Sequence, residues 1–308
     1  MTLQQLEYIV AVDKYRHFVK AAESCKVTQS TLSALIQKLE QELDVVIFDR
    51  KSHPIKPTAL GEAVIKQAKI VLFNASQLQE FVLSEKEKER GEIRMGIAST
   101  VAPYVLPKLF KLFAAQHPLI KLTVEESRMA TIMQKLERAE LDVALMATPL
   151  ENPQLLEIPL YKERLVAYVS RADELFKQKE LDVNNLPTDN LWVLQEGYCP
   201  KGGFFSFCNR QSGKASIYEA GSIETLVKIV DECGGYTIIP ELHVPLLRNC
   251  QQGQIRQLKN PEPSREVALI IRHDYVHQRL LNILADCIKQ VIPSSMLNER
   301  MKKFSIVI

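Results

Sequence analysis

The sequence of 308 residues has no hydrophobic run close to the roughly 18 residues that a membrane-spanning helix needs. Its first residues show no basic stretch followed by an apolar stretch, so we expect a cytoplasmic protein that does not bind a membrane. It also lacks the composition of disordered, collagen-like or low-complexity chains, because 46% of the residues are hydrophobic and 25% are charged. At about 100–200 residues per domain, this length predicts two or three folded domains.

Charge of one sign and close cysteine pairs are also missing. The sequence carries 39 basic and 37 acidic residues, so its net charge of +2 gives no argument for a nucleic-acid or membrane partner. Its six cysteines have the spacing of neither a disulfide framework nor a zinc site: Cys25, Cys199, Cys208, Cys233, Cys250 and Cys287. His273 and His277 form a ligand-like pair with no third ligand in sequence reach, so we expect no metal and no cofactor.

The first 58 residues have the pattern of a small helical domain. Apolar residues recur at helical spacing between residues 3 and 22, and Thr28 is placed to cap a further helix. The apolar run 45–48 and the polar, proline-bounded turn 51–57 predict a β-hairpin, with Thr58 as a cap behind it. Helices followed by a hairpin indicate a winged helix-turn-helix.

One exposed face of the helix after Thr28 is predicted to carry short amide and hydroxyl side chains: Gln29, Ser30, Thr31, Ser33 and Gln37. Such side chains pair with base edges and phosphates, and helix N-termini bind phosphate. Three basic residues of the wing would add contacts to a DNA backbone: Arg50, Lys51 and Lys56. The alternative is a helical bundle whose polar face meets only water.

Residues 59–90 predict one long helix that ends in a charged linker. Apolar residues follow each other at spacings of four and three, which is the seam of a coiled coil: Val64, Ala68, Val71, Ala75, Leu78 and Val82. This seam favours a dimerisation helix, and the alternative is a helix packed within its own domain.

Residues 91–308 alternate strands with helices, a pattern typical of a doubly wound α/β architecture. The predicted strands are 93–97, 120–124, 143–146, 165–169, 191–194, 236–239 and 267–271, and the predicted helices are 103–116, 131–138, 222–232 and 277–291. We expect two lobes, roughly 91–163 plus 268–308, and 164–267. Ligands usually bind in the cleft between such lobes.

The segment from Glu196 to Cys208 contains two cysteines, Cys199 and Cys208, with eight residues and two adjacent glycines between them. Lys201 would favour the thiolate of Cys199, and thiolates react with peroxide to give a sulfenic acid that a second thiol converts to a disulfide. A disulfide needs Cα atoms within about 7 Å, so bridging an extended or helical segment would force it to refold. The alternative is that both cysteines are small buried hydrophobic residues.

A dense set of positions in the first 61 residues forms a recognisable signature: Phe18, Ala21-Ala22, Val27-Thr28-Gln29-Ser30, Leu32-Ser33, Ile36, Leu39-Glu40, Leu43, Phe48-Asp49-Arg50 and Thr58-Ala59-Leu60-Gly61. This signature resembles that of LysR-type transcriptional regulators, and the likeness covers essentially the whole chain. It implies a winged helix, a linker helix and a two-lobed effector domain similar to periplasmic binding proteins.

Within that family, four strings are similar to the peroxide-sensing OxyR branch: 98–104, 196–208, 221–226 and 234–240. The resemblance implies Cys199 as the peroxidatic thiol and Cys208 as the resolving thiol, with Thr100 as a hydroxyl near the peroxide and Tyr198 and Lys201 as assisting residues. Some positions depart from the branch, since Tyr198 replaces a frequent histidine, Pro200-Lys201 replaces Leu-Arg, and Met129 replaces a frequent threonine. These departures concern the peroxide hydrogen-bond network rather than the two-thiol chemistry.

The sequence thus predicts a DNA-binding activator of oxidative-stress genes that senses hydrogen peroxide through a reversible Cys199–Cys208 disulfide. We expect it to bind promoter DNA and RNA polymerase and to associate as a dimer or homotetramer. The alternative is a LysR-type regulator whose interdomain cleft binds a small-molecule inducer. An enzyme, such as a thiol peroxidase on the α/β lobes, is disfavoured by the helix-turn-helix and the heptad helix.

Overall fold

The computed structural model describes residues 1–50, 52, 54–86, 90–150, 152–187, 189–193 and 222–297. The chain divides into two compact units, Met1–Lys88 with Arg138–Glu140, and Glu89–Glu137 with Leu141–Ile308. No helix within the described ranges is long and apolar enough to cross a bilayer.

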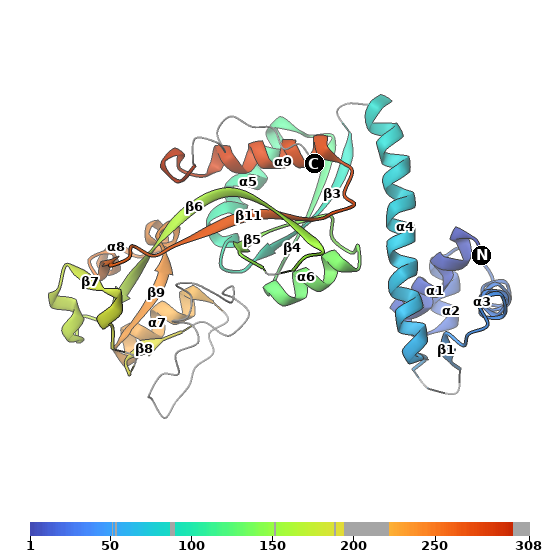
Figure 1. Cartoon of the computed structure of the whole chain (residues 1–308), viewed down its shortest axis with the longest axis horizontal. Coiled ribbons are helices and arrows are strands. Elements are labelled where there is room, and N and C mark those ends of the chain that lie inside the picture. The colour runs from blue at the N-terminus through green and yellow to red at the C-terminus, as the bar shows by residue number, and fades with distance from the viewer. Residues whose placement is uncertain are drawn as a thin grey trace. The chain divides into compact units, whose positions relative to one another are not determined.

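The first unit is a helical domain with a small hairpin (Figure 1). Its elements are α1 (Leu3–Tyr15), α2 (Phe18–Ser24), α3 (Gln29–Leu43), β1 (Phe48–Asp49), β2 (Lys56–Pro57) and α4 (Ala59–Lys86). Apolar side chains of the three short helices pack with Ile47, Phe48 and Ile65 in one core. As predicted, Thr28 caps α3, because its hydroxyl accepts the Thr31 amide at 3.2 Å. The winged helix-turn-helix is confirmed.

The hairpin strand begins later than the sequence predicts. Instead of a strand over 45–48, only Phe48–Asp49 pairs with Lys56–Pro57. Val45 lies in the turn that closes α3, since its amide donates to the Glu40 carbonyl at 2.9 Å. The Ile47 amide then donates to the Glu40 carboxylate at 2.8 Å, which takes the place of a strand partner.

Gly61 lies where α4 passes close to the backbone before the wing. A Cβ at this position would lie 2.0 Å from the carbonyl oxygen of Ile47, so no larger side chain fits without moving the main chain. The Gly61 amide also donates to the Thr58 hydroxyl at 2.9 Å, which confirms the predicted cap. Helix and wing are therefore packed against each other at this glycine.

We expect Gly61→Ala to lower the free energy of unfolding of the first unit by about 1–3 kcal/mol, the usual cost of overpacking. Urea unfolding followed by circular dichroism measures this change, with Leu60→Ala as control because Leu60 is 56% exposed. Trp192, the single tryptophan, lies in the second unit. Its fluorescence should therefore show that the unfolding transition of the second unit is unchanged. Equal stability of the two variants would contradict the close approach.

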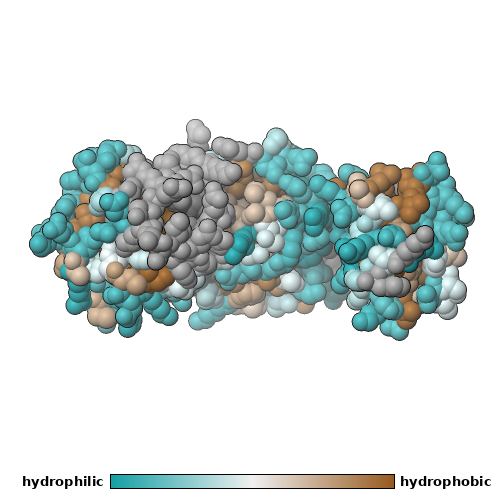
Figure 2. Space-filling model, turned by 90° about the horizontal axis from the view of Figure 1, so that it is seen from below, coloured by the Kyte–Doolittle hydropathy of each residue, from teal (hydrophilic) through white to brown (hydrophobic). Residues whose placement is uncertain are grey.

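The apolar seam of α4 has two different environments. Val64 and Ala68 pack against the core of the first unit, as the within-domain alternative predicts. Val71, Leu78 and Val82 are instead 41%, 66% and 46% exposed in the single chain. Figure 2 shows hydrophobic surface in small patches among hydrophilic residues on this unit. The within-domain alternative therefore holds for the first part of the helix, and dimerisation through the exposed part stays a prediction.

The second unit contains two sheets that share a strand. The first sheet has the order β4-β3-β5-β11-β6, with the bounds β3 (Gly91–Ala98), β4 (Ile120–Ser127), β5 (Val143–Thr148), β6 (Leu155–Val169) and β11 (Ser264–Arg272). The helices of this lobe are α5 (Ala102–Gln116), α6 (Met129–Glu137) and α9 (Gln278–Val291). Helix α5 packs against α9, while α6 packs against β3 and β5.

The second sheet continues from the far end of β6 (Figure 1). Its other strands are β7 (Glu180–Asp182), β8 (Leu191–Trp192), β9 (Tyr236–Pro240) and β10 (Ile255–Lys259). The helices are α7 (Ile223–Cys233), α8 (Asn249–Gln252) and the 3-10 turns η1 (Glu174–Lys177), η2 (Val183–Asn185) and η4 (Glu241–Leu246), with η5 (Ser294–Met296) after α9. Residues up to Arg164 pair with β11, and residues from Leu165 pair with β9, so β6 passes from one sheet to the other.

The sequence predicts most of these elements within a few residues, but it misses the first ten residues of β6 and all of β7 and β10. Only 165–169 reads as a strand, because Pro159 and the charged residues Lys162, Glu163 and Arg164 interrupt the apolar pattern. The structure shows one strand of 15 residues from Leu155 to Val169. Its first ten residues, which include Pro159 and the charged residues, pair with β11, with a register shift between Val267 and Ala268.

Candidate functional site

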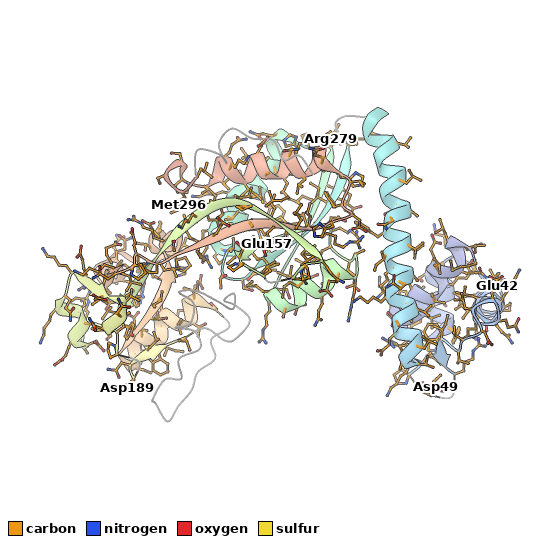
Figure 3. The ribbon with its side chains drawn as sticks, in the orientation of Figure 1. Glu42, Asp49, Glu157, Asp189, Arg279 and Met296 are labelled. Carbon is orange, nitrogen blue, oxygen red and sulfur yellow. The ribbon has the colours of Figure 1, made fainter. Side chains whose placement is uncertain are left out.

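The predicted recognition residues lie on the exposed side of α3. Gln29, Ser30, Thr31 and Gln37 are exposed and Ser33 is half-buried, whereas Leu32, Ile36 and Leu39 are fully buried. Figure 3 marks the two ends of this region in the first unit, Glu42 near the end of α3 and Asp49 on the wing. The helix therefore presents a polar face of the composition that reads base edges.

Three hydroxyls gather at the N-terminus of α3. The Thr28 hydroxyl lies 2.9 Å from that of Ser30 and 2.8 Å from that of Thr31. The positive end of the helix dipole and the first-turn amides lie at the same place, where phosphate is favoured. This turn is suited to contact a DNA backbone.

The three basic wing residues have different environments. Lys56 is exposed on β2, and Lys51 lies outside the described residues. The Arg50 guanidinium donates to Glu40 at 2.9 Å and lies over the Phe18 ring, 5.6 Å from its centroid. Because Glu40 also accepts the Ile47 amide, Arg50 helps to hold the wing on α3. The Arg50 guanidinium is therefore less available to bind a DNA phosphate than the sequence suggests.

In the second unit, Thr100 lies at the carboxyl end of β3. This edge of the parallel strands is where ligands bind in α/β folds. The neighbouring strand β4 ends at Ser127, and Met129, the departure from the OxyR pattern, follows it as a buried residue of α6. Thr100 is itself only 3% exposed.

Thr100 is held by a buried ion pair that sequence reasoning missed. Arg265 of β11 donates through one Nη to the Thr100 hydroxyl at 3.1 Å and through the other to the Thr100 carbonyl at 2.8 Å. Its Nε donates to Glu163 of β6 at 2.6 Å. Glu163 and Arg265 are cross-strand partners. The sequence did contain a signal for a buried charge here, because strand alternation puts Glu163 on the same face as the apolar residues Tyr161 and Leu165.

The surroundings of this pair are unusually polar for a buried site. Burial raises the pKa of Glu163, and the Arg265 guanidinium offsets part of that rise. Tyr104 donates to the Thr100 carbonyl and stacks edge-on against His243 of η4, with 6.0 Å between ring centroids. Burial also raises the pKa of Tyr104 and lowers that of His243. Elements of both lobes therefore meet around Thr100.

Some polar atoms of this cluster have no hydrogen-bond partner among the described residues. These atoms are Tyr161 Oη, Glu163 Oε2 and His243 Nδ1, all on residues at most 2% exposed. The Glu163 carboxylate also accepts a hydrogen bond from the Leu242 backbone, which offsets part of the rise that burial causes in its pKa.

The predicted redox residues Tyr198, Cys199, Lys201 and Cys208 lie outside the described residues. The other four cysteines have free thiols: Cys25 is half-buried, Cys233 and Cys250 are exposed, and Cys287 is buried. Cys25 follows α2 at the turn before α3 and packs against the core of the first unit. Cys250 lies in the first turn of α8. Burial raises the pKa of Cys287 to about 11, which makes this thiol unreactive.

Within the described ranges, no group of three His, Cys, Asp or Glu side chains is placed to hold a metal ion. The ring of His273 lies against the Pro153 carbonyl, 3.1 Å from Nε2, and His277 is buried beside Tyr275.

A winged helix-turn-helix with an exposed polar helix, joined to a two-lobed α/β domain, defines a DNA-binding regulator with an effector domain rather than an enzyme. The chain belongs to the LysR family of bacterial regulators. Residues 3–62 match the model of the bacterial regulatory helix-turn-helix protein, lysR family, and residues 86–293 match the LysR substrate binding domain. The resemblance read from the first 61 residues is thus confirmed.

Several relatives are similar over almost the whole chain. The hydrogen peroxide-inducible genes activator of Haemophilus influenzae is 30% identical, covering 95% of this chain and 99% of the relative. A solved structure of full-length OxyR from Pseudomonas aeruginosa, a cysteine-to-aspartate variant, is 28% identical with a TM-score of 0.80, covering 97% and 98%. The HTH-type transcriptional regulator EstR of Acinetobacter baylyi is also 30% identical, covering 94% and 97%.

Proposed function

We propose that this protein is a peroxide-responsive transcriptional regulator that acts through a reversible disulfide between Cys199 and Cys208. The observation that carries the proposal is its end-to-end similarity to a hydrogen peroxide-inducible genes activator. Two cysteines in one short segment supply the chemistry that such a response requires.

The proposed reaction has two steps. The Cys199 thiolate attacks one oxygen of hydrogen peroxide, an S–O bond forms and the O–O bond breaks. Hydroxide leaves and becomes water by taking up the proton that the Cys199 thiol released on ionising. The Cys208 thiolate then attacks the sulfenic sulfur, so that an S–S bond forms and the oxygen leaves as a second water after protonation. Two thiols are oxidised and one peroxide is reduced. Lys201 favours the thiolate and Tyr198 lies beside it in sequence.

In this reaction the Thr100 hydroxyl would act next to the peroxide. It lies at the ligand-binding edge of the first sheet, and Arg265 fixes it from behind at 3.1 Å. A fixed hydroxyl can donate a hydrogen bond to an oxygen that gains negative charge as the O–O bond breaks. The disulfide would refold a segment of the second lobe (164–267) and so shift that lobe against the first (91–163 with 268–308).

We further propose that the regulator binds promoter DNA as a dimer or tetramer and contacts RNA polymerase. The exposed side chains of Val71, Leu78 and Val82 supply an apolar seam for pairing α4 with a second copy. Two copies place two α3 helices in successive major grooves, where Gln29, Ser30, Thr31, Ser33 and Gln37 read the bases. Lys51 and Lys56 contact the DNA backbone, while Arg50 mainly holds the wing on α3 through Glu40.

Peptide mapping before and after one equivalent of peroxide tests the disulfide. In the full chain we expect the peptides of Cys199 and Cys208 to become linked and to separate again with a thiol reductant. In Cys208→Ser we expect a sulfenic acid on Cys199, trapped by a dimedone-type reagent. Cys287, whose thiol is buried, serves as the internal unreactive control. Free thiols at both Cys199 and Cys208 after stoichiometric peroxide would refute the proposal.

A second candidate is a regulator whose cleft binds a small-molecule inducer. It is favoured by the match of residues 86–293 to the LysR substrate binding domain. The equal identity to EstR, which is named only as a transcriptional regulator, means that 30% identity alone does not select the effector. In this case a metabolite would shift the DNA footprint, and the shift would persist in Cys199→Ser.

A further inference from the structure

Glu163 is linked to Thr100 through one intervening side chain. Its Oε1 accepts the Arg265 Nε at 2.6 Å, and the two Nη groups of the same guanidinium reach the Thr100 hydroxyl and carbonyl at 3.1 and 2.8 Å. Glu163, Arg265 and Thr100 are 1%, 5% and 3% exposed. The guanidinium is therefore fixed at both ends inside the protein.

This chain of contacts sets the direction of the Thr100 hydroxyl. A guanidinium has only donors, so the Thr100 oxygen must act as the acceptor of the Arg265 bond. The hydroxyl hydrogen then points away from Arg265 and is left to donate. Without an acceptor at its other edge, the guanidinium would be free to turn away from Thr100.

Glu163 is well placed to keep this geometry. It is the register partner of Arg265 on two neighbouring antiparallel strands, so the pair is anchored on rigid backbone rather than on a loop. Burial also removes the competing water that weakens an exposed ion pair.

We propose that Glu163 is a positioning residue for the thiol reaction: it holds Arg265, and Arg265 keeps the Thr100 hydroxyl as a hydrogen-bond donor toward the departing peroxide oxygen. The inference rests on the proposed function, because it assumes that Cys199 reacts with peroxide near Thr100. In this proposal Glu163 acts only through Arg265 and takes no part in making or breaking bonds.

The test compares two reactions of Cys199 in the full chain, followed by peptide mapping. Oxidation by peroxide needs a donor at the leaving oxygen, whereas alkylation by iodoacetamide does not. We expect Glu163→Gln to slow oxidation by about 10- to 100-fold, the value of one charge-assisted hydrogen bond, and to leave alkylation unchanged. The matched control is Asp142→Asn, the same carboxylate-to-amide change in a different buried ion pair, in which Arg94 donates to Asp142 at 2.7 Å. It should alter neither rate.

A double-variant cycle separates positioning from a general structural role. In a Thr100→Val background the hydroxyl is gone, so Glu163→Gln should cause no further slowing of oxidation. An additive effect in that background, a wild-type oxidation rate in Glu163→Gln, or equal slowing of alkylation would overturn the inference. If wild-type Cys199 does not react with peroxide at all, the proposed function itself fails.

Trp192 fluorescence reports whether each variant folds, since this residue lies in the same unit. If Glu163→Gln does not fold, Glu163→Asp keeps the charge and shortens the reach by one carbon. Its oxidation rate should then fall between the wild type and Thr100→Val. A wild-type rate in Glu163→Asp, or one as low as that of Thr100→Val, would contradict the expected dependence on reach.

Discussion

Replacing Cys199 by serine is expected to abolish the peroxide-dependent change in the DNA footprint, raising the peroxide concentration needed for any response by about 100-fold or more. Serine keeps the size of the side chain, but its hydroxyl is not ionised near neutral pH and cannot attack peroxide. DNA fragments selected by the purified protein provide the probe, and footprints with and without peroxide provide the measurement.

The controls separate loss of sensing from loss of folding. Without peroxide, Cys199→Ser should bind the selected DNA as tightly as the wild type, because no predicted recognition residue is changed. Cys287→Ser should keep the full response, since that thiol is buried in α9 with a raised pKa. A footprint that still shifts with peroxide in Cys199→Ser would assign sensing to another group.

Replacing Arg265 by methionine is expected to cost about 3–5 kcal/mol of unfolding free energy in the second unit, because Glu163 is left as a buried, uncompensated charge. With Arg265 gone, the Glu163 pKa rises further above its unfolded value. A protein that buries a carboxyl with a raised pKa loses stability as the pH rises through that folded-state pKa. The loss of unfolding free energy in Arg265→Met should therefore be larger at alkaline than at acidic pH. Urea unfolding followed by Trp192 fluorescence measures both effects.

The matched double variant decides whether the cost comes from the charge. Glu163→Leu combined with Arg265→Met removes both charges and should recover most of the lost stability, since an apolar pair of similar size is usually tolerated. A single-variant cost below about 1 kcal/mol would indicate a solvated pair of the exposed kind. Equal costs in the single and double variants would point to lost packing instead.

Local signals in the sequence predicted local structure well. Thr28 and Thr58 cap helices through hydrogen bonds to residues only three positions further along the chain. Their roles can therefore be predicted from neighbouring residues. The alternation of Ile93, Met95 and Ile97 likewise predicts β3, where all three are buried.

The features that were missed depend on contacts distant in sequence. Glu163 and Arg265 are 102 residues apart, and only the register of β6 on β11 makes them a pair. For the same reason, Arg50 reads as a free wing cation until Glu40 of α3 is placed beside it. Charge in an otherwise apolar strand face was the available signal for Glu163, and it was outweighed by the apparent break in the strand pattern.

The register of the two long strands has a consequence for protein engineering. Arg164 and Ser264 face each other as antiparallel partners, so the chain leaves and re-enters the first sheet at adjacent points. A short turn could join them and excise residues 165–263, which include both Cys199 and Cys208. The first sheet and the helix-turn-helix would keep all their own strands and helices. We expect the shortened chain to lack the proposed peroxide response, because both cysteines are removed with the middle lobe.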